Sequence, residues 1–266
     1  MIDTHCHLTY KGLIERVDAV VARAGEAGVD RMISVGTSPD DARLALGLTR
    51  RFDGVYSTVG VHPHDAHQWR DRDAVADVMR ELAGQAKVVA LGEMGLDRHY
   101  PDPPIGDQRR AFEWQLEIAA ELDGVSAKPQ AALPIIVHNR EATDDVIAMI
   151  RDSDVPGGRF VFHCFTGDDG ELDAILELGA MVSFTGIVTF KNARSLAASA
   201  ARVPDDRIMI ETDAPYLTPE PYRKVRPNEP CYVPHVARFL AARRGVDADA
   251  FVQQVDANAR RVFGLP

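Results

Sequence analysis

The chain has 266 residues, of which 45% are hydrophobic and 26% are charged, a composition typical of a soluble globular protein. Its net charge of −10 argues against a protein that grips long duplex nucleic acid by releasing counterions. No apolar run approaches the roughly 20 residues that cross a bilayer. The beginning of the sequence also lacks the basic and apolar segments of a signal peptide, so we expect a cytoplasmic protein with no membrane partner.

Eight short apolar runs predict strands that are buried on both faces, as in a parallel sheet. These runs cover residues 1–7, 31–35, 55–59, 88–91, 135–137, 160–162, 181–184 and 207–210. Helical stretches separate the strands and close the chain, at residues 13–27, 40–50, 73–82, 107–122, 144–150, 171–178, 193–200, 234–244 and 248–262.

The alternation of strand and helix predicts a (β/α)₈ barrel, the TIM barrel of the α/β class. A doubly wound open sheet is the structural rival, and it is disfavoured because the sequence contains no glycine-rich nucleotide-binding loop. No repeat, charge run or low-complexity linker divides the chain, so we expect one domain over residues 1–266.

Histidines and acidic residues stand at the ends of the predicted strands, where the active sites of barrels lie. The residues that end or directly follow these strands are His5, His7, His62, His64, Glu93, His138, His163 and Asp213. A single histidine after a strand is usually a packed core residue. Four histidines and two acids that end five strands instead favour a metal centre made of His5, His7, Glu93, His138, His163 and Asp213.

Four of these residues suggest particular roles. His5 and His7 are two apart on a strand, so their side chains face the same way and can bind one ion. Glu93 follows a buried run, where a carboxylate is costly unless it is paired or bound to a metal, and its two oxygens could bridge two ions. Asp213 could bind a metal and also accept the proton of an attacking water. We therefore predict Asp213 and Glu93 as catalytic residues.

Other polar residues have weaker signals. His62 is placed to contact a substrate phosphate, although a loop histidine is often merely solvated. Glu211 is interpreted as a partner of a ligand or as a residue of the barrel interior. The cysteines Cys6, Cys164 and Cys231 lack a CxxC spacing and are expected to be reduced packing residues.

Seven segments spread along the chain, taken together, resemble the TatD family of metal-dependent hydrolases, which are DNase-like members of the amidohydrolase superfamily. They are DTHCH at 3–7, GVHPH at 60–64, GEMGLD at 92–97, IVH at 136–138, HCFTG at 163–167, ETDAPYL at 211–217 and NEP at 228–230. The resemblance implies a TIM barrel that binds two divalent ions. One ion site would contain His5, His7, Asp213 and the bridging Glu93, and the other would contain Glu93, His138 and His163.

The resemblance also implies metal-dependent cleavage of phosphodiester bonds, often from the 3′ end, with single-stranded or frayed DNA or RNA ends as the expected substrate. The mixed nitrogen and oxygen ligands suit Zn²⁺ and Mn²⁺, whereas Mg²⁺ prefers more oxygen. Two rivals stay open. One is an amidohydrolase acting on a small amide or ester, although many such enzymes bridge their metals with a lysine. The other is a non-catalytic metal-binding barrel.

Two stretches depart from the family pattern. Residues 123–132 look like an insertion before the fifth strand, and the basic segment 221–227 lacks the glycine that we expect there. Both leave the predicted ligands unchanged. The second departure leaves the substrate preference open, since Arg223, Lys224 and Arg226 could meet a phosphate or be merely solvated.

Overall fold

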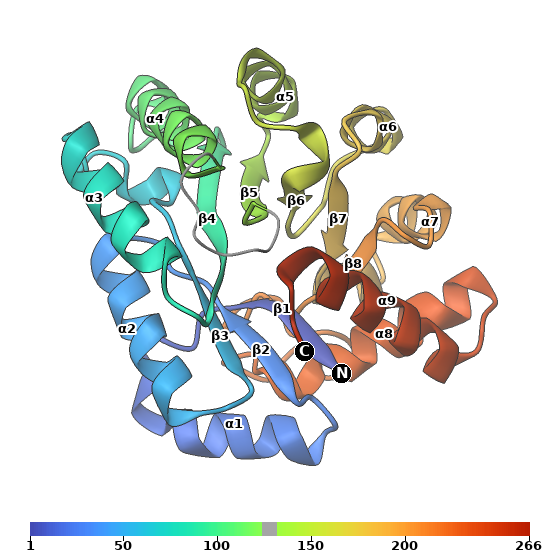
Figure 1. The fold of residues 1–266 in the computed structure, drawn as a ribbon. Helices are drawn as coiled ribbons and strands as arrows, with labels where there is room; N and C mark the ends of the chain where they lie inside the picture. The colour runs from blue at the N-terminus through green and yellow to red at the C-terminus, as the bar shows by residue number, and fades with distance from the viewer. Residues whose placement is uncertain (124–131) are drawn as a thin grey trace.

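Eight parallel strands form the centre of the molecule, and they are hydrogen-bonded in chain order from β1 to β8. The computed structural model describes residues 1–123 and 132–266. The strands are β1 (Ile2–Cys6), β2 (Arg31–Ser34), β3 (Val55–Val59), β4 (Val88–Asp97), β5 (Ile135–Arg140), β6 (Phe160–Phe162), β7 (Met181–Phe184) and β8 (Ile208–Ile210). Figure 1 shows them as an inner ring, which confirms the predicted TIM barrel.

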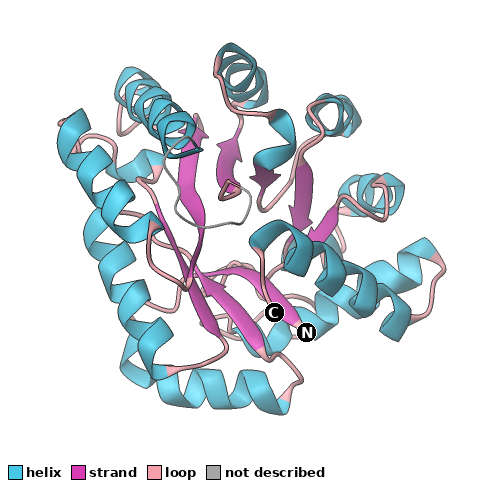
Figure 2. Ribbon diagram, viewed as in Figure 1, coloured by secondary structure: helices cyan, strands magenta, loops and turns pink. Residues whose placement is uncertain are grey.

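Helices cover the outside of this ring (Figure 2). They are α1 (Val17–Glu26), α2 (Pro39–Arg51), α3 (Arg72–Ala83), α4 (Ile105–Asp123), α5 (Thr143–Asp152), α6 (Asp169–Glu177), α7 (Arg194–Arg202), α8 (Val233–Arg244) and α9 (Ala248–Phe263). Short 3₁₀ turns complete the connections: η1 (Ile14–Arg16), η2 (Pro63–Asp65), η3 (Gly157–Arg159), η4 (Gly186–Thr189) and η5 (Pro230–Tyr232). The first predicted helix, 13–27, therefore begins with η1 and becomes α-helical only at Val17.

Two strands continue well beyond their predicted ends. β4 runs to Asp97 and β5 to Arg140, and their ladder pairs Gly95 with His138 and Asp97 with Arg140. The sequence prediction ended these strands at Leu91 and Val137, before the polar residues Glu93 and His138. The backbone ladder continues there because polar side chains can point into the open end of the barrel.

The amino-terminal end of the barrel is filled by apolar side chains. The inward-facing residues of this layer are Ile2, Ile33, Tyr56, Val89, Ile136, Val161, Met181 and Met209. Phe263 at the end of α9 and Leu265 just after it join the same cluster. Because this end is filled, the chemistry-bearing side chains can gather only at the opposite, carboxyl-terminal end.

The contact between the first and last strands differs from the other strand pairs. In place of a continuous ladder, Cys6 of β1 forms an isolated parallel bridge with Ala214, which follows β8. The fully buried Asp3 of β1 accepts hydrogen bonds from the amide and the hydroxyl of Thr212, at 2.9 and 2.5 Å. A side-chain clasp therefore helps to join β1 to the segment after β8.

The helices, the 123–132 segment and the cysteines bear on three further expectations from the sequence. Every helix within the described ranges is too short or too polar to span a membrane. The predicted insertion at 123–132 falls mainly on residues 124–131, which lie outside the described residues. All three cysteines are free. Cys6 is fully buried as expected, whereas Cys164 and Cys231 are only partly buried.

Candidate metal centre

The six predicted ligands meet at the carboxyl-terminal end of the barrel. Glu93 and His138 lie within β4 and β5, His5 and His7 lie at the end of β1, and His163 and Asp213 follow β6 and β8. All of them except His5 line a cavity of about 920 Å³. His5 lies beneath the others and is fully buried. The structure thus brings together side chains that are far apart in the sequence.

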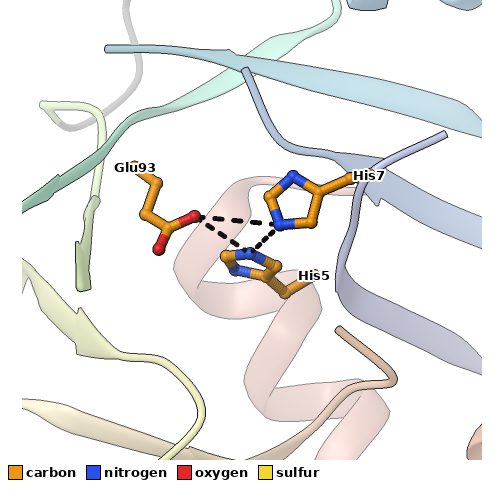
Figure 3. Close-up of side chains that lie close together, drawn as sticks. All are labelled: His5, His7 and Glu93. Carbon is orange, nitrogen blue, oxygen red and sulfur yellow. Dashed lines mark hydrogen bonds and ion pairs between the residues drawn. The ribbon is translucent and has the colours of Figure 1, made fainter. Parts of the chain in front are cut away.

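One oxygen of Glu93 faces the histidines of β1 (Figure 3). Glu93 Oε2 lies 3.3 Å from His5 Nε2 and 3.9 Å from His7 Nε2. The two imidazole nitrogens are 3.3 Å apart. Asp213 Oδ1 joins this group at 3.7 Å from His5 Nε2 and 3.3 Å from His7 Nε2.

The other oxygen of Glu93 faces three further histidines. Glu93 Oε1 lies 2.7 Å from His138 Nδ1, 2.8 Å from His163 Nε2 and 3.4 Å from His62 Nε2. His138 Nδ1 and His163 Nε2 are 3.5 Å apart. The resemblance implies that Glu93, His138 and His163 bind the second ion. The structure adds His62 to this group.

The spacing of these atoms fits a divalent ion. Bonds of about 2.1 Å in a tetrahedral site place ligand atoms about 3.4 Å apart. The separations in the group of His5, His7, Glu93 and Asp213 lie between 3.3 and 3.9 Å. On the other side of the carboxylate the donors lie closer together, and the group there whose ligand atoms all lie near enough to hold one ion is His62, Glu93 and His138.

The charge on Glu93 is balanced by its neighbours. Burial alone would raise the pKa of this carboxyl, but His163, His62 and His5 outweigh burial and hold the pKa well below its usual range. His163 shows the reciprocal effect, since Glu93 and Glu211 raise its pKa well above the usual value in spite of burial. The centre therefore favours positive charge beside a carboxylate, as a metal site must.

Two glycines allow β4 to place Glu93 at the centre. A Cβ atom on Gly60 would lie 2.6 Å from the Cα of Gly92. Gly92 itself has a φ of +108°, and a Cβ there would lie 2.5 Å from the carbonyl oxygen of Ile136. Only glycine permits this close approach of β3, β4 and β5.

Two buried carboxylates, Asp97 and Glu211, support candidate ligands. The sequence prediction gave no role to Asp97. Asp97 Oδ2 lies 3.3 Å from His138 Nε2 and 2.8 Å from His64 Nε2, which leaves His138 Nδ1 facing Glu93. Glu211 Oε1 lies 3.4 Å from His163 Nδ1, in the position expected of a ligand's partner. Such carboxylates set the orientation and tautomer of metal-binding histidines. Asp97 belongs to the GEMGLD segment, so its position could have suggested this role.

Hydrogen bonding determines the tautomer of His62. The backbone amide of His64 donates to His62 Nδ1 at 3.0 Å, so a neutral His62 carries its proton on Nε2. Burial lowers the pKa of His62 to about 4, which keeps the ring neutral near pH 7. His62 therefore presents an N–H donor to the centre of the site, at 3.1 Å from His138 Nδ1.

The segment that carries Asp213 is held by a buried asparagine. Asp213 has a φ of 52°, a strained conformation for a residue with a side chain. Asn228 Nδ2 donates to the carbonyl oxygens of Thr212 and Tyr216, at 3.0 and 2.5 Å. These bonds on both sides of Asp213 keep its carboxylate turned toward the histidines.

The basic residues of the cavity are not those of the 221–227 segment. Arg226 binds Thr218 and the carbonyl of Val225, and Arg223 stacks on Phe190 at 4.0 Å. Among the described residues that line the cavity, Arg140 is the only lysine or arginine. The sequence prediction missed Arg140 because it ended β5 at Val137.

A TIM barrel with histidines and carboxylates at its catalytic end defines a metal-dependent hydrolase. The chain belongs to the TatD related DNase family, whose model matches residues 2–264. The resemblance expected from the motifs is thereby confirmed.

Relatives match over nearly the whole length. A protein of Dickeya dadantii (strain 3937), named 3′-5′ ssDNA/RNA exonuclease TatD, is 40% identical over 99% of this chain and 97% of its own. An uncharacterized metal-dependent hydrolase of Bacillus subtilis (strain 168), YabD, is 35% identical over 100% of this chain and 99% of its own. The crystal structure of YJJV, a TatD homolog from Escherichia coli K12, is 28% identical with a TM-score of 0.88, and covers 100% of this chain and 98% of that one.

Proposed function

We propose that this hydrolase removes nucleotides from the 3′ ends of single-stranded or frayed DNA and RNA, with two divalent ions held on either side of Glu93. The two-sided arrangement of donors around the Glu93 carboxylate is the observation that carries the proposal. The Dickeya dadantii relative, named as a 3′-5′ exonuclease of single-stranded DNA and RNA, supports the same substrate class.

His5, His7, Asp213 and Glu93 would hold one ion, and Glu93, His138 and His163 the other. Zn²⁺ and Mn²⁺ suit these mixed donors better than Mg²⁺. When bound, such ions lower the pKa of a coordinated water and polarise a phosphoryl oxygen. The residues of the chain then position the phosphate and receive the proton.

Asp213 is the residue that we assign as proton acceptor. Burial would raise its pKa, but His7 and His5 outweigh burial and lower it, so the side chain is a carboxylate near neutral pH. It reaches the cavity with 13% of its side chain exposed. General-base assistance of this kind typically contributes about 10²–10⁴ in rate.

His62 and Arg140 are the groups that would bind the phosphate. The Nε2 proton of His62 points into the centre and can be donated to a phosphoryl oxygen. Arg140 lines the same cavity and has no ion-pair partner within residues 1–123 and 132–266, so its guanidinium can receive a phosphate.

The charge of the site favours strand ends over internal duplex. Several carboxylates line the cavity beside Arg140, the one arginine of its described lining, and the chain has a net charge of −10. Such a surface cannot hold a long duplex by its phosphates. An unpaired end, in contrast, can enter a cavity of this size and bring one phosphodiester to Glu93.

The test is degradation of 5′-labelled single-stranded oligonucleotides by protein loaded with Zn²⁺, Mn²⁺ or Mg²⁺. We expect a ladder of products shortened one nucleotide at a time from the 3′ end, and little cutting of closed circular duplex. Glu93→Gln is the control for contaminating nuclease and should remove the activity. Equal rates on closed circular duplex and on the oligonucleotide would contradict the proposal, as would turnover of a small amide or ester without cleavage of any nucleic acid.

A further inference from the structure

Two half-exposed tyrosines stand beside the metal centre at the wall of the cavity. Tyr10 and Tyr216 are 45% and 46% exposed, and both line the cavity. Their ring centroids are 5.5 Å apart with an angle of 70° between the planes. Large aromatic side chains exposed at a binding cavity often contact a ligand.

The backbone ties this aromatic pair to the predicted ligands. The amide of Tyr10 donates to the carbonyl oxygen of His7 at 3.0 Å, and the amide of Tyr216 donates to that of Asp213 at 2.9 Å. Asn228 also binds the carbonyl of Tyr216. The pair is therefore held next to the ion site of His5, His7 and Asp213, rather than on a separate part of the surface.

The other exposed tyrosine at the cavity has a different environment. Tyr100 is 47% exposed, but Arg140 lies over its ring at 5.2 Å, and His64 and His99 contact it edge to face. Tyr10 and Tyr216, by contrast, have ring contacts only with each other among the described residues. Their edge-to-face arrangement leaves ring surface available for a planar ligand.

The small number of basic side chains at the cavity favours such a contact with the ligand. Proteins that bind single strands combine a basic groove with aromatic side chains on which bases stack. The described lining of this cavity contributes Arg140 as its only lysine or arginine. Base stacking on the exposed tyrosines would add affinity to the few phosphate contacts that His62 and Arg140 can make.

We infer that the Tyr10–Tyr216 pair is the binding site for an unpaired nucleobase next to the scissile phosphate. The inference rests on the proposed nuclease function and gives it a physical basis for selecting single strands. A base in a duplex already stacks on both faces, whereas an unpaired base at a strand end has a face available for tyrosine. Because every base offers such a face, the site tolerates any sequence.

The test compares oligonucleotides that carry a tetrahydrofuran abasic residue at one of the last two 3′ positions with the intact oligonucleotide. Stacking is worth about 5- to 150-fold per base in affinity. We expect KM to rise by at least about fivefold for one of the two abasic positions, with a smaller change in kcat. Tyr10→Ala and Tyr216→Ala should each reduce this discrimination, and the double variant should remove it.

Two further variants separate stacking from other effects. Tyr216→Phe keeps the ring and should keep the discrimination between intact and abasic ends. Tyr222→Ala is the matched control, because Tyr222 is 41% exposed but packs against Tyr232 and His235 and does not line the cavity. This control should behave as the unaltered protein does.

Binding in the presence of EDTA gives a readout that needs no cleavage. Fluorescence anisotropy of labelled intact and abasic oligonucleotides should show the same preference for a base, and its loss in the double tyrosine variant. If the unaltered protein cleaves and binds intact and abasic ends equally well, the base site is wrong and the nuclease function stands. If it prefers a base in binding but cleaves no oligonucleotide, the base site stands and the proposed function fails.

Discussion

Replacing Asn228 by alanine should weaken both the fold and one ion site. The side chain is fully buried and makes three hydrogen bonds, two donated to the carbonyls of Thr212 and Tyr216 and one accepted from the amide of Glu229 at 2.9 Å. A buried backbone group left without a partner costs about 1–3 kcal/mol. Two of the three bonds are buried and the bond to Tyr216 is part-buried, so we expect a loss of at least about 2 kcal/mol in the free energy of unfolding.

The effect on metal affinity is the specific part of this prediction. Thr212 and Tyr216 stand on either side of Asp213, so their release lets its carboxylate turn away from His5 and His7. Changes to groups that support metal ligands typically cost 10- to 100-fold in metal affinity. We expect a loss of this size for one ion, with the other ion little affected.

Asn258→Ala is the matched control for Asn228→Ala. Asn258 is also buried, and its Nδ2 donates to the carbonyls of Asp205 and Ile208, at 2.7 and 2.9 Å. These groups lie at the amino-terminal end of β8, away from the ligands. Urea unfolding of metal-stripped protein and calorimetric titration with Zn²⁺ measure the two effects. Equal metal affinity in the two variants, or a loss of under about 1 kcal/mol for Asn228→Ala, would refute this reasoning.

Three other predictions concern the metals. Elemental analysis of protein never exposed to chelator should find up to two divalent ions per chain, and no stoichiometric binding of Zn²⁺, Mn²⁺ or Mg²⁺ would rule out the two-ion centre. Asp213→Asn, assayed for kcat and bound metal in one sample, should lose about 10²–10⁴ in turnover even when its ion is restored; recovery of near-normal turnover would make Asp213 a ligand alone. Stability of the stripped protein should fall as pH rises above about 7. Burial lowers the pKa of His7, His138 and His163, but their acidic neighbours outweigh it and raise each pKa above the usual 6.5, so the folded chain binds protons there that the unfolded chain has lost. Added Zn²⁺ replaces these protons and should oppose the decline, whereas thermal melts of stripped protein that are flat from about pH 7 to 9 would contradict this account.

The sequence was sufficient to predict the barrel and to place the six candidate ligands at one end of it. Buried parallel strands appear as apolar runs, and the residue that ends each run identifies what reaches the active-site face. His5, Glu93 and Asp213 could therefore be placed at one end before any contact between them was known. The family resemblance added the predicted division of these donors between two ions.

The remaining parts depend on contacts that no linear pattern encodes. Asp97 and Arg140 lie in extensions of β4 and β5 that the polar residues of those strands obscured. Tyr10 and Tyr216 meet only when β1 and β8 come together around the barrel. The tautomer of His62 depends on the hydrogen bond from the amide of His64, which requires the geometry of η2.

The junction of β1 and β8 also determines when during synthesis the protein can become active. Asp3 and Thr212, which clasp the two strands, are 209 positions apart in the chain. His5 and His7 leave the ribosome with the first strand, whereas Asp213 emerges only after the eighth strand has been made. A nascent chain therefore lacks one of the candidate donors until Asp213 has been made, and the six candidate ligands can assemble only after all eight strands are available.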